Sequence, residues 1–131
     1  MTSYNDKKNN RILLVDDEPD IIHAVAMILE DNGFLVDSFT DPTLALSNFK
    51  PGLYDLLVLD IRMPKMNGFE LYQKMKEIDS NAKICFFTAS ELFYEEYRRL
   101  DNYPKVDKEY FIQKPFRTKE LIRHLNEILS D

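Results

Sequence analysis

Short apolar runs alternate along the chain with longer stretches in which apolar residues recur at helical spacing. The short runs are rich in Val, Ile, Leu and Phe, as is typical of strands in a sheet that is covered on both faces. They predict five strands, over residues 12–15, 34–39, 56–59, 84–87 and 110–112.

The amphipathic stretches between these runs predict five helices. The first contains apolar residues from Ile21 to Leu29, and Gly33 is the expected stop. Asp41 followed by proline has the composition of an N-cap and a first helical residue. Thr118 is the predicted N-cap of the last helix, and the other two helices are expected over residues 69–78 and 92–100.

Such an alternation of strands and helices predicts an α/β protein with a doubly wound, five-stranded parallel sheet. Crossover connections in these sheets are right-handed, and ligands bind beyond the carboxyl ends of the strands where the winding direction reverses. Functional residues are therefore expected directly after the strands.

Polar residues that could carry chemistry follow four of the five predicted strands. Asp16 and Asp17 follow the first strand, and Asp60 follows the third. Thr88 follows the fourth strand, and Lys114 comes soon after the fifth. Because parallel strands end at one edge of the sheet, these side chains are expected to converge there.

Three neighbouring carboxylates repel one another unless a cation lies between them. Their oxygen atoms suit Mg²⁺, which commonly binds one or two protein carboxylates together with phosphate oxygens. An aspartate can also accept a phosphoryl group as an acyl phosphate, and Asp60 is the best candidate because it is the lone carboxylate on the expected central strand. The simpler alternative is a set of solvated carboxylates at loop ends.

Four motifs occur in order at the ends of these strands: ILLVDDEPD, DLLVLDIRMPKMNGFEL, Thr88-Ala89 and Lys114-Pro115-Phe116. With them the chain resembles the response-regulator receiver domains of two-component systems, from about residue 11 to about residue 129. The resemblance implies a CheY-like sheet with strand order 2-1-3-4-5 flanked by five helices. It also implies a stand-alone receiver domain over residues 11–131, preceded by a polar, flexible arm over residues 1–10.

The resemblance further implies a Mg²⁺ site around the phosphoacceptor. Asp60 would accept the phosphoryl group, and Asp17 would hold the metal more directly than Asp16, which would act partly through water. Arg62 would contribute its main-chain carbonyl to the metal.

A second set of implied roles concerns the switch that follows phosphorylation. The hydroxyl of Thr88 would move toward the phosphoryl group, Lys114 would pair with that group, and the rotamer of Phe111 would follow Thr88. The bond between Lys114 and Pro115 is expected to be cis, a form that only X-Pro bonds adopt at low cost. Thr88 as a turn former and Phe111 as a core residue are the alternatives.

Composition narrows the range of partners. A net charge of −6 and the absence of a basic stripe argue against direct binding to nucleic acid. Cys85 is the single cysteine and lies in an apolar strand, so a packing role is expected for it. No apolar run has the length of a membrane span, and a cytoplasmic location is expected.

The segment between Thr88 and Lys114 departs from the family pattern. It lacks the usual small Gly-Ala step and is rich in aromatic and charged residues. Because exposed Tyr and Arg are favoured at interface hot spots, it could form a partner surface, although a packed helix with an extended loop is an equal alternative. The residues of this hypothetical partner surface are Phe93, Tyr94, Tyr97, Arg98 and Tyr103.

The predicted function is a signalling switch rather than an enzyme with an external substrate. A histidine kinase or a phosphotransfer protein would phosphorylate Asp60. The face formed by the fourth helix, fifth strand and fifth helix would then bind an unknown output protein or support a phosphorylation-dependent homodimer.

Two other functions compete with the switch. One is a phosphorylation-independent scaffold, which would not need a complete set of site residues. The other is an aspartyl-phosphate phosphohydrolase, which is disfavoured because Arg62 stands where such enzymes carry a second acid. Arg62 and Ser90 also occupy family positions that influence the lifetime of the acyl phosphate, which the sequence leaves undetermined.

Overall fold

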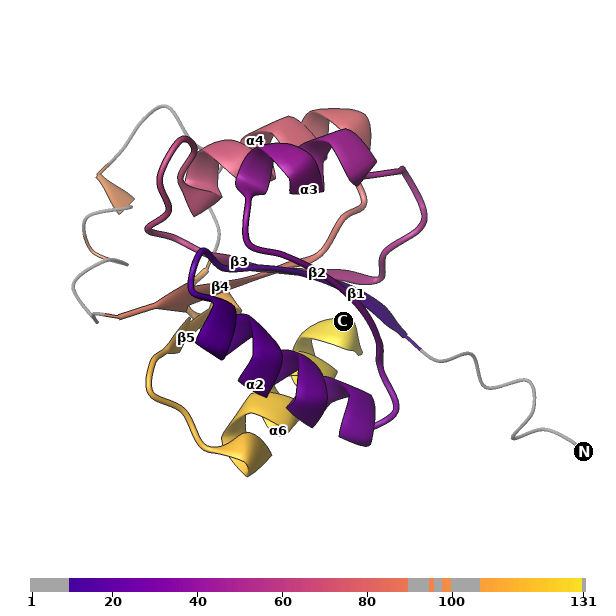
Figure 1. Ribbon diagram of the computed structural model, residues 1–131, viewed down its shortest axis with the longest axis vertical. Helices are drawn as coiled ribbons and strands as arrows, with labels where there is room; N and C mark the ends of the chain where they lie inside the picture. The colour runs from indigo at the N-terminus through magenta and orange to yellow at the C-terminus, as the bar shows by residue number, and fades with distance from the viewer. Residues whose placement is uncertain (1–9, 90–94, 96–97, 100–106, 131) are drawn as a thin grey trace, which may run out of the picture.

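The computed structural model describes residues 10–89, 95, 98–99 and 107–130. Five parallel strands form one sheet in the predicted order β2-β1-β3-β4-β5 (Figure 1). The strands are β1 (Arg11–Val15), β2 (Leu35–Phe39), β3 (Leu56–Asp60), β4 (Ile84–Thr88) and β5 (Phe111–Gln113). The described α-helices are α2 (Pro19–Asp31), α3 (Pro42–Asn48), α4 (Gly68–Ile78) and α6 (Thr118–Leu129), and a 3-10 turn, η1 (Lys108–Tyr110), precedes β5.

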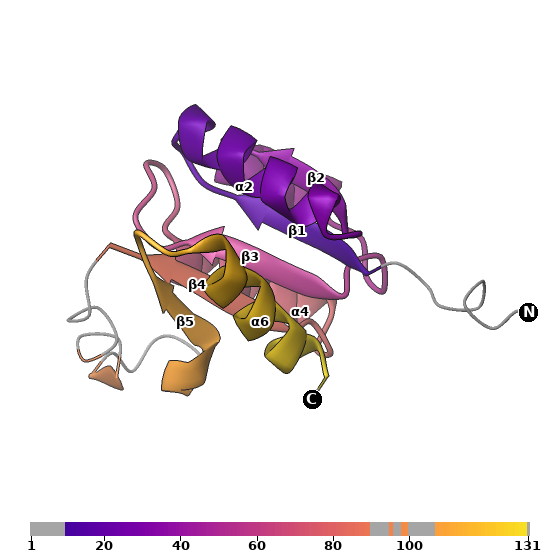
Figure 2. The same ribbon diagram turned by 90° about the horizontal axis from the view of Figure 1, so that it is seen from below.

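Helices cover both faces of the sheet. α3 and α4 lie on one face, and α2 and α6 lie on the other (Figures 1 and 2). Because side chains alternate along a strand, Leu57 packs beneath α3 and α4, whereas Leu56 and Val58 pack beneath α2 and α6. Every residue of β3 and β4 is buried, which explains their unbroken apolar runs. Each large apolar side chain buried there contributes roughly 1.5–3 kcal/mol to stability.

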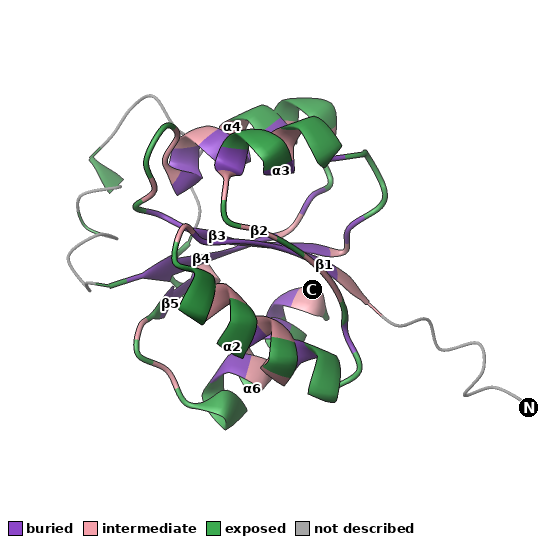
Figure 3. Cartoon of the chain, in the orientation of Figure 1, coloured by how far each residue is buried: buried purple, intermediate pink, exposed green. Residues whose placement is uncertain are grey.

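A polar network holds the edge of the sheet at β2, in addition to the apolar packing of Val36 and Phe39. Figure 3 shows the buried central strands and the exposed outer faces of the helices. On β2, the carboxylate of Asp37 lies 3.0 Å from the guanidinium of Arg11 and accepts a 2.7 Å hydrogen bond from the hydroxyl of Tyr54. Burial, together with the hydrogen bond to Asp37, raises the pKa of Tyr54 to about 12. This network connects the amino-terminal ends of β1 and β3 to the middle of β2.

Phe34 does not belong to the second strand, contrary to the prediction. Its main-chain N–H donates to the carbonyl of Leu29, and the N–H of Gly33 donates to the carbonyl of Glu30. With Gly33 at φ +90°, these bonds form the Schellman ending of α2. Phe34 is buried because its side chain packs in the same apolar cluster as Leu29, as is common in this ending. An apolar residue there reflects the helix end rather than the start of the strand.

Other predicted boundaries differ by one residue, among them the starts of the last helix and of the fifth strand. Thr118 is the first residue of α6, and Arg117 is the N-cap, with extended backbone and no capping hydrogen bond from its side chain. The main-chain carbonyl of Arg117 accepts the first helical bond, from the N–H of Leu121, which places the cap one residue earlier than the side-chain preference of threonine suggested. Tyr110 lies in η1 and not in β5.

The predicted start of α3 is confirmed. Asp41 is its N-cap and accepts a 2.9 Å hydrogen bond from the N–H of Thr43, and Pro42 is the first helical residue. Four of the five predicted helices are therefore described, since the one expected over residues 92–100 falls largely outside the described residues. Among the helices that the structure describes, none has the length and apolar character needed to cross a membrane.

Candidate functional site

Three carboxylates converge at the carboxyl ends of the central strands. Asp16 and Asp17 follow β1 directly, and Asp60 is the last residue of β3, which pairs with β1 in the sheet. One carboxylate oxygen of each residue lies within 4.8 Å of those of the other two. Asp16 is fully buried, Asp60 is 6% exposed and Asp17 is half-buried, so the cluster opens to solvent on the side of Asp17.

Lys114 provides a positive charge beside these carboxylates. Its ammonium lies 2.8 Å from Oδ2 of Asp16 and 3.3 Å from Oδ1 of Asp60. The main-chain N–H of Lys114 donates a 2.7 Å hydrogen bond to the carbonyl of Thr88, which holds the residue at the end of β4. The peptide bond between Lys114 and Pro115 is cis, as predicted.

One ammonium does not balance three carboxylates. Burial, followed by the negative charge of Asp16, raises the pKa of Asp60 to about 7, although Lys114 acts in the opposite direction. Burial by itself lowers the pKa of Lys114, but the hydrogen bond to Asp16 and the charge of Asp60 outweigh it and raise that pKa overall. Lys114 therefore stays charged, but the positive charge near Asp60 is too small to keep the pKa of that carboxyl group at its ordinary value.

The two neighbouring aspartates differ in how their oxygens are used. Oδ1 of Asp16 accepts a 3.0 Å hydrogen bond from the N–H of Glu18, and its Oδ2 pairs with Lys114. Both oxygens of Asp16 thus already contact protein donors. Asp17 is more exposed and contributes an oxygen to the cluster, so it is the better placed of the two for direct binding of a cation.

The start of α4 packs directly against the backbone of Asp60. The N–H of Gly68 donates a 2.8 Å hydrogen bond to the carbonyl of Ile61. A Cβ atom at Gly68 would lie 2.3 Å from the carbonyl oxygen of Asp60, which is far inside van der Waals contact. The position of Gly68, between a strand-end aspartate and the start of a predicted helix, was the sequence signal for this close approach.

The next residue back, Asn67, fixes the same helix start. Its side chain accepts from the N–H of Glu70, and the side chain of Glu70 accepts from the N–H of Asn67, which forms a capping box. Two features thus hold α4 against the end of β3: a reciprocal cap and a glycine that permits close approach.

Thr88 and Phe111 lie on β4 and β5, the two strands that follow β3 in the sheet order. Thr88 is the last residue of β4, is 4% exposed and is paired with Gln113 of β5. Phe111 is 9% exposed, and its ring centroid is 5.2 Å from that of Phe86 and 6.5 Å from that of Phe69. In this structure the ring of Phe111 is therefore packed in the apolar core.

The remaining predicted residues lie outside the cluster or outside the described residues. Arg62 is exposed and lies two positions after Asp60. Arg98 is exposed, with its guanidinium 3.6 Å from the carboxylate of Glu95. The other four residues of the hypothetical partner surface are not among those that the structure describes: Phe93, Tyr94, Tyr97 and Tyr103.

The fold and the site together define a class of protein, a CheY-like α/β domain with an acidic cluster at the carboxyl end of its parallel sheet. The chain matches the family model of the response regulator receiver domain over residues 12–126. It belongs to this family, whose members are signalling switches phosphorylated by histidine kinases rather than catalytic enzymes.

Curated relatives are longer than this chain. Transcriptional regulatory protein DltR of Streptococcus agalactiae serotype III (strain NEM316) is 34% identical over 115 residues, which cover 88% of this chain and 50% of that protein. Transcriptional regulatory protein TrcR of Mycobacterium tuberculosis (strain ATCC 25618 / H37Rv) is 32% identical over 119 residues, which cover 91% of this chain and 45% of that protein. The chain thus spans about half the length of these relatives.

Solved structures show the same fold. A CheY-like receiver domain protein from Methanospirillum hungatei JF-1 has a TM-score of 0.79 and 25% identity, covering 94% of this chain and 95% of that one. The non-phosphorylated HemR receiver domain from Leptospira biflexa has a TM-score of 0.78 and 29% identity, covering 94% and 96%. The receiver domain of sensor histidine kinase PA1611 from Pseudomonas aeruginosa PAO1, which has magnesium coordinated in its active-site cleft, has a TM-score of 0.77 and 23% identity, covering 95% and 100%.

The raised pKa of Asp60 predicts a pH-dependent gain in stability for Asp60→Asn in the absence of metal. Burial and the charge of Asp16 raise the pKa of Asp60 to about 7 in the folded chain, whereas in the unfolded chain the carboxyl group has its ordinary pKa of 3.8. Wild-type stability therefore falls as the pH rises from about 4 to about 7. We expect Asp60→Asn to raise the free energy of unfolding by about 1–4 kcal/mol at pH 8 and by much less at pH 5.

Urea denaturation in the presence of a chelator at both pH values measures this difference. Asp107→Asn, which changes an exposed carboxylate, serves as the control and should show no such dependence on pH. Equal effects of Asp60→Asn on the free energy of unfolding at pH 5 and pH 8 would contradict the raised pKa of Asp60.

The close approach of Gly68 predicts a specific defect in Gly68→Ala. The added methyl group must displace the carbonyl of Asp60, and overpacking of this kind costs about 1–3 kcal/mol. Gly33→Ala is the matched control, because it costs about 1–2 kcal/mol through its positive φ but meets no neighbouring atom. Two-dimensional NMR should show shifted amide signals for Asp60 and Ile61 only in Gly68→Ala; unshifted signals there would be the contrary result.

Proposed function

We propose that the chain is a phosphorylation switch in which Asp60 accepts a phosphoryl group from a histidine kinase or a phosphotransfer protein. The convergence of the three aspartates within 4.8 Å, with Lys114 against two of them, is the observation that carries this proposal. Membership of the receiver family supports it. We assign the receiver domain to residues 11–131, since β1 begins at Arg11.

The donor set fits Mg²⁺. Three carboxylates with one ammonium leave an excess of negative charge. Burial and the charge of Asp16 together raise the pKa of Asp60. We assign Asp17 and Asp60 as direct ligands, Asp16 as a ligand through water, and Arg62 as the donor of a main-chain carbonyl. Bound Mg²⁺ would supply positive charge to the phosphoryl oxygens. The magnesium coordinated in the active-site cleft of the PA1611 domain supports a magnesium site here.

The chemistry that we propose is a direct transfer. A carboxylate oxygen of Asp60 forms a bond to phosphorus while the bond between phosphorus and the donor histidine nitrogen breaks. The donor imidazole keeps the electron pair of that bond and takes up a proton. The ammonium of Lys114, already 3.3 Å from Asp60, is in reach of the phosphoryl oxygens, and the hydroxyl of Thr88 donates to them.

We further propose that phosphorylation changes the conformation around Thr88 and Phe111. Thr88 moves toward the phosphoryl group, which frees space at the end of β4 next to β5. Phe111 then changes its rotamer within the aromatic cluster that it shares with Phe86 and Phe69. The added charge of the phosphoryl group would in this way shift the equilibrium between two conformations of Thr88 and Phe111.

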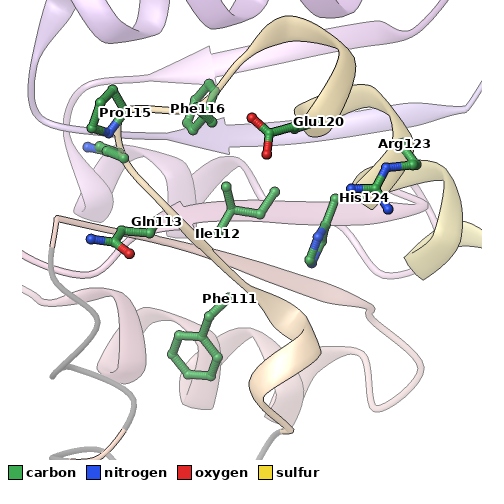
Figure 4. Close-up of a pocket in the computed structure, with 9 residues that line it drawn as sticks. Phe111, Ile112, Gln113, Pro115, Phe116, Glu120, Arg123 and His124 are labelled. Carbon is green, nitrogen blue, oxygen red and sulfur yellow. The ribbon is translucent and has the colours of Figure 1, made fainter.

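The output surface that we propose includes β5 and α6. A hollow of 470 Å³ lies between them, and Figure 4 shows Ile112 and His124 on this side of β5 and Phe111 on the opposite side. The imidazole of His124 hydrogen-bonds the carbonyl of Glu109 in η1, which ties α6 to the turn before β5. An output protein, or a second copy of the chain, would bind here after phosphorylation.

Intact mass measured after incubation with a small-molecule phosphodonor tests the proposed function. With Mg²⁺ we expect the mass of one added phosphoryl group, because the metal offsets the charge of the acidic cluster. Without metal or in Asp60→Asn no addition is expected, whereas the control Asp107→Asn should behave as wild type. Metal-dependent addition that persists in Asp60→Asn would refute the assignment of Asp60. No addition to the wild type, with the donor verified on another receiver, would favour a scaffold or rapid dephosphorylation.

NMR with beryllofluoride, a mimic of the phosphoryl group, tests the proposed output surface. We expect the amide signals of Ile112, Gln113 and His124 to shift when the mimic binds, because β5 follows the movement of Thr88. The amides of Gly52 and Asp79, which lie together at the other end of the strands, are the internal control. Shifts confined to the acidic cluster would contradict transmission through β5.

A further inference from the structure

The loop between β3 and α4 borders the acidic cluster and is anchored at both ends. At its start, the N–H of Ile61 donates to the carbonyl of Phe87 in β4, and at its end Gly68 donates to the carbonyl of Ile61. Between these anchors the loop carries Arg62, the residue assigned to the metal through its main-chain carbonyl. The position of that carbonyl therefore depends on how the middle of the loop is held.

Lys65, in the middle of this loop, has an unfavourable backbone conformation. Among the described residues it is the one non-glycine residue with positive φ, at +72°. An L-residue enters this region only when surrounding interactions determine it. Its ammonium lies 3.0 Å from Oδ2 of Asp41, which is 24 residues away in sequence.

Asp41 is a fixed anchor for that ammonium. Its Oδ1 caps α3 by accepting hydrogen bonds of 2.9 Å from the N–H and 2.7 Å from the hydroxyl of Thr43, which leaves Oδ2 directed to Lys65. The hydrogen bonds from Thr43, with that from Lys65, hold the pKa of Asp41 at about 2. One carboxylate thus joins the start of α3 to the loop that follows β3.

We propose that the ion pair between Lys65 and Asp41 positions the β3–α4 loop for metal binding and thereby sets the Mg²⁺ affinity of the acidic site. This inference rests on the proposed function and assigns Lys65 and Asp41 as positioning residues that do not touch the metal. Because the ammonium is largely exposed, the pair is of the kind that changes an equilibrium by about two- to fivefold. Salt should screen that effect.

Two single variants separate positioning from a simple effect of charge. Lys65→Asn removes the ammonium but keeps a residue that tolerates positive φ. Asp41→Asn removes the charge but keeps an N-cap for α3. By charge alone, Lys65→Asn would strengthen cation binding and Asp41→Asn would weaken it. If the ion pair positions the loop, both variants weaken cation binding.

Isothermal titration calorimetry with Mg²⁺ on the unphosphorylated full chain measures the affinity. We expect each single variant to raise the dissociation constant about two- to fivefold, and the double variant to raise it no further, because both changes break one interaction. Lys65→Arg should retain wild-type affinity. The difference in dissociation constant between the wild type and the two Asn variants should become small in about 1 M salt. The phosphorylation rate at saturating Mg²⁺ should change much less than the dissociation constant.

Matched controls make the outcomes distinct. Lys74→Gln changes an exposed lysine on α4 and should leave the dissociation constant unchanged. Opposite effects of Lys65→Asn and Asp41→Asn, additive effects in the double variant, or unchanged affinity in both would overturn the inference while leaving the proposed function intact. Absence of Mg²⁺ binding by the wild-type chain would overturn both.

Discussion

Much of the site depends on the contact between the ammonium of Lys114 and the buried carboxylates of Asp16 and Asp60. Burial of an ionised carboxylate is costly, and a second carboxylate nearby adds repulsion. Lys114 lowers this cost without removing it, which is why the pKa of Asp60 remains near 7. In the proposed function this residual imbalance favours a divalent cation, because a site that is already neutral would gain little from binding one.

The parallel sheet is what forces these charges together. β1, β3 and β4 are adjacent and point the same way, so their last residues lie at one end of the sheet. The winding direction reverses between β1 and β3, which opens a crevice at that end. Unbroken apolar runs bury the strands between two helical layers and fix their register. The core therefore holds the acidic residues near one another against their repulsion, and Gly68 lets α4 begin directly against the backbone of Asp60.

Sequence predicted the sheet, its strand boundaries to within one residue and the acidic cluster because each rests on a local signal: an apolar run followed by a polar residue. Its errors have equally local causes. Phe34 continues an apolar run but serves the Schellman ending of α2, and the cap of α6 is a main-chain arrangement at Arg117 that side-chain preference does not reveal. The pair formed by Lys65 and Asp41 was missed for a different reason. It joins two loops 24 residues apart and depends on a positive φ at a lysine, which composition does not indicate.

The position of Lys114 links the proposed chemistry to the proposed output surface. Its ammonium contacts the phosphoacceptor, while its main chain is bonded to the end of β4 and immediately follows β5. In the proposed function, formation of the acyl phosphate replaces the charge of Asp60 by that of a larger phosphoryl group, and we expect the ammonium of Lys114 to take a new position relative to Asp16. Any such movement acts on the short connection from β5 to α6, which carries the hollow beside His124. Lys114, which offsets the buried negative charge, is thus also the first residue of the segment between β5 and α6. A movement of Lys114 would therefore act directly on the proposed output surface.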